Sequence, residues 1–200
     1  ISFNFETRLL PIVFSWLRLP ANRTPMIRTL NQMVETVLSL KRKYRVAVAW
    51  AQDPHTIGAI HRTVSEGFTD AYLIGRTSDI INTCRSEGIK EKLFQIVEAA
   101  NEIIASSIAV AMVKNGQADI VMKGMVGTDI FLKAVMDKEN GLMLPRAVLS
   151  YVGAIQIPTY HKLLFITDPA VIPYPNLDQK ISMASYAVEM AHRFGINKPK

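Results

Sequence analysis

The chain has 200 residues, of which 49% are hydrophobic and 20% charged, a composition typical of a globular protein with a buried core. Its formal charge is +6, but the basic residues form no patch interleaved with aromatic residues, so we expect no nucleic-acid partner; a positive charge also suits an enzyme whose ligands are polyanions. The single cysteine, Cys84, excludes an intramolecular disulfide and a cysteine-rich zinc site and agrees with a reducing, cytoplasmic location.

The first 25 residues contain an apolar middle that charged residues and prolines interrupt. The uncharged part is too short to cross a bilayer, and the segment has neither the basic start nor the cleavage site of a signal peptide. We therefore expect no membrane partner, and we interpret residues 1–25 as a leader of doubtful nativeness that precedes a start at Met26.

A helix is predicted over residues 24–43, with Thr24 as N-cap, Pro25 at its first position and apolar residues at helical spacing. Strand and helix patterns then alternate, which is typical of a parallel sheet covered by helices on both faces. The expected strands are residues 44–51, 70–75, 93–99 and 118–124, and the expected helices between them are residues 54–66, 78–88 and 101–116.

The pattern changes after a further helix over residues 127–137. Two apolar runs, residues 146–158 and 162–168, follow each other with no helix between them, which favours antiparallel or edge strands. A last amphipathic helix is expected over residues 176–194, with Gly195 at its end. We therefore predict an α/β protein with a three-layer αβα arrangement, a first domain over residues 26–142 and an incomplete second domain over residues 143–200.

Lys123 is the first candidate site residue, because it ends an expected buried strand. Ligands of open α/β sheets collect at the carboxyl ends of strands, where helix N-termini present N–H groups. Gly124 lets the backbone approach a ligand, and Thr128 either caps the next helix or binds a ligand oxygen. Lys133 could curl back from that helix. The alternative, a solvent-exposed lysine beside an ordinary N-cap threonine, is about equally compatible with the spacing.

Asp168 is the second candidate, at the end of an apolar run and just before Pro169. A carboxylate there could orient a ligand or accept a proton, although an aspartate before proline is also a common turn opener. Ser150 lies in an expected strand without a nucleophile elbow around it. The four histidines lack metal-ligand spacing, so we expect no metal site.

The stretches "ADIVMKGMVGTDIFLKAVM", "LSYVGAIQIP", "LLFITDPAV" and "AVEMAHRFGINKPK" resemble the phosphate acetyltransferase and phosphate butyryltransferase family, and the butyryl branch in particular. The resemblance implies two α/β domains like those of isocitrate and isopropylmalate dehydrogenases, with the active site in the cleft between them. It also implies that the protein continues past Lys200, so we expect this chain to be C-terminally truncated and, by itself, nearly inactive.

The resemblance further implies the reaction acyl-CoA + phosphate = acyl phosphate + CoA, with coenzyme A as a substrate, no permanently bound cofactor, and a homodimer or higher homo-oligomer. Lys123, Gly124 and Thr128 match the butyryl-branch motif, and Lys133 falls where the acetyl branch has a phosphate-binding arginine. Asp168 matches a family aspartate and is expected to orient or polarise the thiol of coenzyme A. Ser150 is expected nearby, as a residue of the substrate site.

Two alternatives remain open at this point. One is another enzyme of the same broad fold, such as an NAD-dependent hydroxyacid enzyme, although no dinucleotide fingerprint is present. The other is a non-catalytic relative that binds acyl-CoA. Tyr151 and Pro169 depart from the family pattern, which gives the second alternative its main support.

Overall fold

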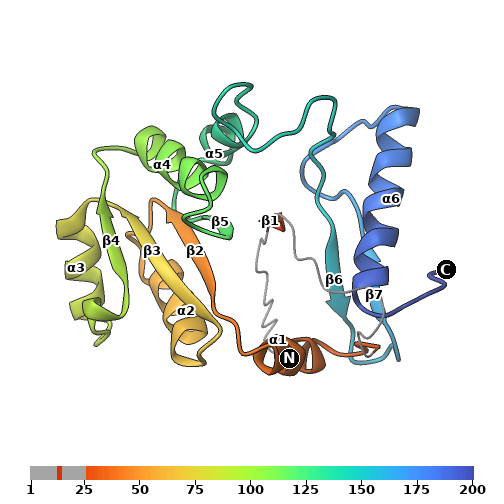
Figure 1. The fold of residues 1–200 in the computed structure, drawn as a ribbon, viewed down its shortest axis with the longest axis horizontal. Helices are drawn as coiled ribbons and strands as arrows, with labels where there is room; N and C mark the ends of the chain where they lie inside the picture. Colours follow the sequence, from red (N-terminus) through yellow and green to blue (C-terminus); the bar gives the residue numbers. More distant parts are fainter. Residues whose placement is uncertain (1–12, 15–25) are drawn as a thin grey trace, which may run out of the picture. The chain divides into compact units, whose positions relative to one another are not determined.

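The computed structural model describes residues 13–14 and 26–200, and the chain divides into two compact units. The first unit includes Lys43–Leu142; the second joins Met143–Lys200 with residues 26–42. Both units mix helices and strands (Figure 1). The expected leader, residues 1–25, which includes the predicted N-cap Thr24 and Pro25, lies outside the described residues apart from the two-residue strand β1 (Val13–Phe14).

The first unit is built on a five-stranded sheet with the order β1-β5-β2-β3-β4. Strands β2 (Tyr44–Ala49), β3 (Thr69–Gly75), β4 (Gln95–Glu98) and β5 (Ile120–Lys123) are parallel, and β1 pairs with β5 in the antiparallel sense. The four parallel strands fall where the sequence predicted them. β2 lies at the centre and its residues are almost wholly buried, as expected for a strand covered on both faces.

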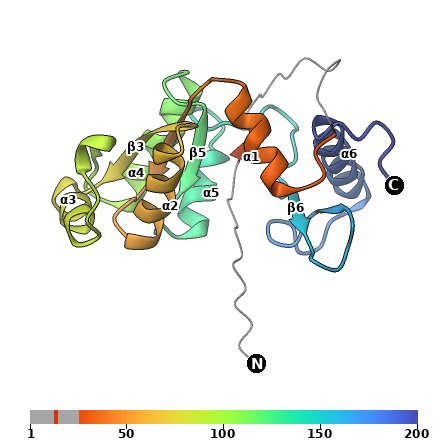
Figure 2. The ribbon, with the colours of Figure 1, turned by 90° about the horizontal axis from the view of Figure 1, so that it is seen from below.

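Helices cover both faces of this sheet (Figures 1 and 2). Helices α2 (Pro54–Ser65) and α3 (Thr77–Ser86) contact β3 and each other, whereas α4 (Glu102–Lys114) packs over β2, β3 and β5. Because parallel connections are right-handed, the return from β4 to β5 places α4 on the face opposite α2 and α3. The three-layer αβα arrangement is therefore confirmed for this unit. The short helix η1 (Glu91–Leu93) precedes β4.

The core on the α2–α3 side explains why these segments fold together. Val46, Val48 and Leu73 from neighbouring strands pack against Ile57 and Ile80 from the two helices, and all five are buried. Cys84 belongs to the same cluster and is fully buried. Burial raises the pKa of its thiol, with a smaller contribution from Glu91, so this cysteine behaves as an apolar core residue.

The amino ends of β2 and β5 are joined by an ion pair. Arg45 donates from Nε to Asp119 Oδ2 and from a terminal nitrogen to Asp119 Oδ1, both at 3.1 Å. The Arg45 N–H donates to the same carboxylate at 2.9 Å, and the Asp119 N–H donates to the Arg45 oxygen at 2.8 Å. This two-pronged contact fixes the register of the central strand pair at the edge remote from Lys123.

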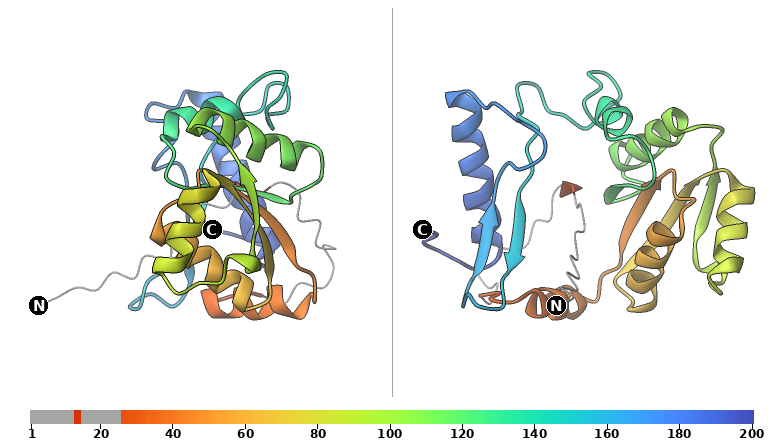
Figure 3. Two further views of the ribbon diagram at one scale, coloured as in Figure 1. Left: turned by 90° about the vertical axis from the view of Figure 1, so that its left-hand side faces the viewer. Right: turned by 180° about the vertical axis from the view of Figure 1, so that it is seen from behind.

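The second unit contains a two-stranded antiparallel sheet and two helices (Figure 3). Strands β6 (Gly153–Gln156) and β7 (Leu163–Ile166) are shorter than the predicted runs, and α6 (Leu177–Arg193) packs against β7. A capping box between Asn176 and Gln179 fixes the start of α6. Gly195, with φ of 77°, follows its last turn, where a left-handed residue is needed.

Helix α1 (Leu30–Ser39) belongs to this second unit, whereas the sequence placed residues 26–42 in the first domain. The reason is local bonding: the Leu30 N–H donates to Gln156 Oε1 and the Ile27 N–H donates to the Phe194 oxygen. The helix also begins later than predicted, because Thr29 is its N-cap and accepts from the Gln32 N–H. The predicted domain boundaries stay a prediction.

Candidate active site

The strand order places a reversal of chain direction between β2 and β5. From β2 the chain proceeds outward to β3 and β4, and then returns over α4 to form β5 on the other side of β2. In sheets of this kind, ligands bind outside the carboxyl ends of the strands on either side of the reversal. Trp50 follows β2 at that edge, and Lys123 ends β5 there. The strand order thus indicates a ligand site at the same edge of the sheet as the sequence did, the carboxyl edge at which Lys123 ends β5.

Gly124 brings the turn after β5 unusually close to the end of β2. Its N–H donates to the Ala49 oxygen at 2.9 Å, and the next N–H, from Met125, donates to the Trp50 oxygen at 3.1 Å. A Cβ atom at position 124 would lie 2.6 Å from the Trp50 oxygen and 2.7 Å from the Ala49 oxygen. Only glycine fits this approach, so a packing requirement of the sheet accounts for Gly124.

The Lys123 ammonium folds onto its own turn. Its Nζ donates to the Val126 oxygen at 2.8 Å and makes a longer contact of 3.4 Å with the Gly124 oxygen. The side chain is half-buried, not freely solvated. An ammonium has three protons to donate, so this arrangement braces the turn and still leaves capacity for a ligand oxygen. Lys123 therefore lies where the sequence predicted a cation, with a structural contact that the sequence did not reveal.

A carboxylate already accepts a hydrogen bond at the N-terminus of α5 (Thr128–Val135). Gly127 is its N-cap, and the Gly127 N–H donates to Glu102 Oε2 at 3.3 Å. Thr128 is exposed and is the first helical residue, and the cap makes no side-chain hydrogen bond. Of the two roles considered for Thr128, capping is therefore not observed, and binding of a ligand oxygen stays a prediction. Lys133 lies exposed in the last turn. An anion that used this helix end would first have to displace Glu102.

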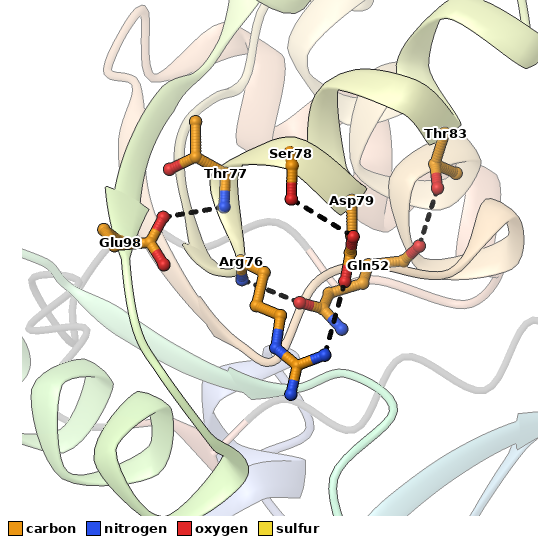
Figure 4. Close-up of polar contacts among 7 residues, drawn as sticks. All are labelled: Gln52, Arg76, Thr77, Ser78, Asp79, Thr83 and Glu98. Carbon is orange, nitrogen blue, oxygen red and sulfur yellow. Dashed lines mark hydrogen bonds and ion pairs between the residues drawn. The ribbon is translucent and has the colours of Figure 1, made fainter.

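A group of polar residues lies at the carboxyl ends of β2, β3 and β4 (Figure 4). These residues were not predicted from the sequence. Gln52 follows β2, and its Oε1 accepts from the Arg76 N–H at 2.7 Å, while its backbone oxygen accepts from Thr83 Oγ1 at 2.8 Å. Glu98 ends β4 and accepts from the Thr77 N–H at 2.8 Å. The Thr77 hydroxyl and N–H lower the pKa of Glu98, and Arg76 adds to the effect.

Arg76 is the cation of this cluster. Its guanidinium carbon lies 5.7 Å from the centre of the Trp50 ring, within the range of a cation–π contact. Its ion pair with Asp79 is long, at 4.0 Å, and both side chains are exposed. Trp50 itself has φ of 58°, an uncommon conformation for a bulky residue and one associated with functional sites. The sequence could have identified Arg76, because this residue directly follows an expected strand, just as Lys123 ends one.

Asp53 adds an unsatisfied acceptor near the end of β2. Its Oδ1 caps α2 by accepting from the Thr56 N–H at 2.9 Å. Its Oδ2 is buried and has no hydrogen-bond partner among the described residues. Buried polar atoms are almost always paired in proteins, so this oxygen is suited to accept a hydrogen bond from a ligand donor or an ordered water.

In the second unit, Asp168 organises a turn after β7. Its Oδ1 accepts from the N–H groups of Ala170 and Val171 at 2.9 and 2.8 Å, and its Oδ2 accepts from the Tyr151 N–H at 3.0 Å. Ser150 Oγ lies 3.2 Å from Thr167 Oγ1. Asp168 thus joins the turn that follows β7 to the segment that precedes β6, which agrees with the turn-opening interpretation.

The surroundings of Asp168 favour its charged form. Partial burial of the carboxyl acts to raise its pKa, but the N–H groups of Val171, Ala170 and Tyr151, together with the Ser150 side chain, outweigh burial and lower the pKa below the ordinary aspartate value. A carboxylate with a lowered pKa is a weaker base, so this geometry favours orienting a neighbour over accepting a proton from it.

The predicted site residues thus form two groups. Lys123, Gly124 and Thr128 lie in or next to the β5–α5 turn of the first unit, and Lys133 lies in the last turn of α5. Ser150 and Asp168 lie together in the second unit. Within the described part of the chain, no three histidine, cysteine, aspartate or glutamate side chains are grouped so that they could hold a metal ion. Helices long and apolar enough to cross a membrane are likewise missing from residues 26–200.

Residues 96–200 match the family described as Phosphate acetyl/butaryl transferase, which is more than half of the chain. The chain belongs to this family. It is 37% identical over 175 residues to a phosphate butyryltransferase of Clostridium acetobutylicum, covering 88% of this chain and 58% of that protein. It is 30% identical over 171 residues to a phosphate acetyltransferase of Thermotoga maritima, covering 86% of this chain and 57% of that protein.

Known structures agree on the fold. A phosphotransacetylase from Streptococcus pyogenes superposes with a TM-score of 0.70 at 13% identity, covering 84% of this chain and 60% of that chain. The chain spans somewhat more than half the length of each curated relative named above. The family resemblance inferred from the motifs around Lys123 and Asp168 is therefore confirmed, and so is the mixed α/β fold with a mostly parallel sheet.

Proposed function

We propose that the protein to which this chain belongs transfers a short-chain acyl group between coenzyme A and inorganic phosphate: acyl-CoA + phosphate = acyl phosphate + CoA. Membership of the phosphate acetyl/butaryl transferase family is the observation that carries this proposal. Because the chain covers 58% of the Clostridium relative and 57% of the Thermotoga relative, the reaction is proposed for the whole protein. The family match gives no support to a hydroxyacid enzyme or a non-catalytic binder.

The reaction needs cations and N–H donors. A phosphate oxygen attacks the thioester carbonyl, the C–S bond breaks, and CoA leaves as a thiolate, so negative charge is present on phosphate, on the carbonyl oxygen and on sulfur. Lys123 is proposed to hold the phosphate oxygens, which the position of its half-buried ammonium at the carboxyl edge of β5 supports. Lys133 is proposed as a second phosphate cation and Thr128 as a residue that positions the ligand.

Arg76 extends this set. A guanidinium binds phosphate with two parallel hydrogen bonds, whereas a lysine acts as a point charge. Arg76 follows the end of β3 and its guanidinium lies over the Trp50 ring, at the sheet edge that also carries Lys123. We propose that it contacts a phosphate of coenzyme A or of the acyl phosphate.

Asp168 and Ser150 are proposed to orient the thiol side of the reaction. The support is the network that holds Asp168 to Ala170, Val171 and Tyr151. Since the pKa of Asp168 is lowered, we assign it an orienting role. In the reverse direction, in which the CoA thiol attacks the acyl phosphate, a different group or water would take up the thiol proton.

Butyryl is the proposed acyl group. The motif around Lys123 resembles the butyryl branch, and the identity to the Clostridium butyryltransferase, 37%, exceeds the 30% to the Thermotoga acetyltransferase. The proposed partners are acyl-CoA, phosphate and acyl phosphate, in a cytoplasmic homodimer or higher homo-oligomer. An architecture like that of isocitrate and isopropylmalate dehydrogenases is also retained as a proposal.

The test is release of free CoA thiol from butyryl-CoA and acetyl-CoA, with and without phosphate, by the protein expressed at the length its gene encodes. The proposal predicts release that requires phosphate and is faster with butyryl-CoA. Faster release from acetyl-CoA would correct the acyl group and leave the reaction standing. No release from either substrate would refute the reaction itself.

A further inference from the structure

Tyr151 lies opposite Asp168, where β6 begins and β7 ends. The register of the two strands sets Gly153 opposite Ile166, and continuing this register by two residues brings Tyr151 opposite Asp168. The Tyr151 N–H donates to Asp168 Oδ2 at 3.0 Å. The backbone of Tyr151 is therefore fixed by the same network that holds Asp168.

The phenol ring of Tyr151 folds over Gly153. A Cβ atom at position 153 would lie 2.7 Å from Tyr151 Oη and 2.9 Å from Cε1 of the ring. Residues two apart in an extended segment share a face, so the ring occupies the space that a side chain at position 153 would fill. The absence of a side chain at Gly153 thus sets the direction of the Tyr151 side chain.

The hydroxyl of Tyr151 has no hydrogen-bond partner among the described residues, where the contacts of this residue are made by its backbone. It is also accessible, because within the same part of the chain Asp53 Oδ2 is the only side-chain polar atom that is both buried and unpaired. Packing over Gly153 needs only the ring, which phenylalanine would supply equally well. The hydroxyl is therefore an oriented hydrogen-bond donor that the fold does not use.

Charge narrows the ligand group that this hydroxyl can meet. The pKa of Asp168 is lowered, so the carboxylate that accepts from the Tyr151 N–H is ionised at neutral pH. A phosphate placed beside this carboxylate would meet a like charge, whereas a carbonyl oxygen would not. A phenol can donate one hydrogen bond to such a neutral acceptor.

We propose that Tyr151 Oη donates a hydrogen bond to the carbonyl oxygen of the acyl group carried by coenzyme A. The inference rests on the proposed acyl transfer. When a phosphate oxygen attacks the carbonyl carbon, the π electrons of the carbonyl move onto its oxygen, and the C–S bond breaks as they return. The hydrogen bond strengthens while that oxygen carries charge, and the phenol keeps its proton throughout.

Carbon-13 resonance measures the contact without turnover. The natural-length protein is labelled at Cζ of tyrosine, and the signal missing from Tyr151→Phe identifies Tyr151. Butyryl-CoA, added without phosphate, is expected to shift this signal. S-butyl-CoA has the same chain without the carbonyl oxygen and is expected to shift it much less. Equal shifts with both ligands, or no shift with either, would overturn the proposal.

Kinetics measure what the contact contributes. Tyr151→Phe is expected to lower kcat for phosphate-dependent thiol release by about a hundredfold, as for loss of one donor to an oxyanion, with an unchanged midpoint of urea denaturation. Tyr151→His offers a ring N–H and is expected to recover part of the rate. Tyr160→Phe makes the same change in the β6–β7 loop, where Tyr160 is 42% exposed, and should leave kcat unchanged. A Tyr151→Phe protein with unaltered kcat would overturn the proposal.

Gly153→Ala tests the placement of the ring. Its Cβ would displace the phenol, so kcat is expected to fall, and adding Tyr151→Phe should lower it little further because both changes remove one hydrogen bond. Losses that multiply in the double variant would contradict this placement. If butyryl-CoA shifts the Tyr151 signal but phosphate brings no thiol release, the proposed reaction fails and the carbonyl contact stands. Phosphate-dependent release without that shift overturns the contact and leaves the reaction standing.

Discussion

Lys123 donates a hydrogen bond from Nζ to the Val126 oxygen at 2.8 Å, so the lysine singled out as a phosphate ligand also closes the turn between β5 and α5. The two roles are compatible, because one ammonium can serve two acceptors. They also make different demands on the side chain, so substitutions at this position can separate binding from stability.

Lys123→Ala is expected to lower kcat/KM for phosphate by about a hundredfold, since a cation aimed at the reacting oxyanion is lost. Lys123→Arg keeps the charge and is expected to retain part of the activity. Lys138→Ala, an exposed lysine after α5, is the control and should leave the kinetics unchanged. If Lys123→Ala lowers stability but leaves kcat/KM for phosphate as it was, the lysine is only a turn brace.

Gly124→Ala is expected to destabilise the protein by about 2–4 kcal/mol, because the new Cβ would meet the Trp50 and Ala49 backbone oxygens and force the strands apart. Gly58→Ala in α2 is the matched control. A Cβ there meets nothing within 4 Å, so alanine is expected to stabilise by about 0.5–1 kcal/mol through its better helix propensity. Urea denaturation of the two variants measures both effects, and equal stabilities would contradict the close approach.

Asp119→Asn removes the charge that pairs with Arg45, and we expect a loss of about 1–2 kcal/mol in the free energy of unfolding. Asp70→Asn breaks the exposed pair with Lys43, whose side chains are 52% and 54% exposed, and should cost less than about 0.5 kcal/mol. Denaturant titrations that rank the two variants in the opposite order would show that the two-pronged contact does not hold β2 and β5 together.

Asp168→Asn is expected to lower stability at neutral pH and to do so less as the pH falls. The folded protein lowers the pKa of Asp168, so its contribution is fully present above the unfolded aspartate value of about 3.9 and is lost as the pH falls through the folded value. Chemical denaturation between pH 7 and pH 3 should therefore show the two proteins converging below about pH 4. A difference that is constant over this range would exclude the charge as its cause.

The sequence predicted the first unit well, because period and composition act locally. The β-branched residues Val46 and Val48 indicate a buried strand from the local sequence alone. Gly88 and Gly116, with φ of 66° and 72°, end helices at the positions expected for glycine. The start of α1 was missed because Thr24 and Thr29 are both good N-caps by type. In the structure, the hydrogen bond from the Gln32 N–H to Thr29 Oγ1 identifies Thr29 as the N-cap of α1.

The candidate site was predicted less completely, because its contacts join residues far apart in the chain. Position after a strand identified Lys123, and the same rule applied to Arg76 would have found the guanidinium beside Trp50. No spacing rule could show that Glu102 would reach the N–H of Gly127, or that the Asp53 carboxylate would keep one buried oxygen without a partner. Those facts depend on how α2, α4 and α5 are oriented on the sheet.

The most direct test of the proposed reaction measures both products together. Butyryl-CoA and phosphate are incubated with the natural-length protein, free thiol is measured, and butyryl phosphate is trapped with hydroxylamine as the hydroxamate. Transfer to phosphate predicts equimolar thiol and acyl phosphate, both absent when phosphate is left out. Thiol release without acyl phosphate would mean that water accepts the acyl group, and would contradict transfer to phosphate.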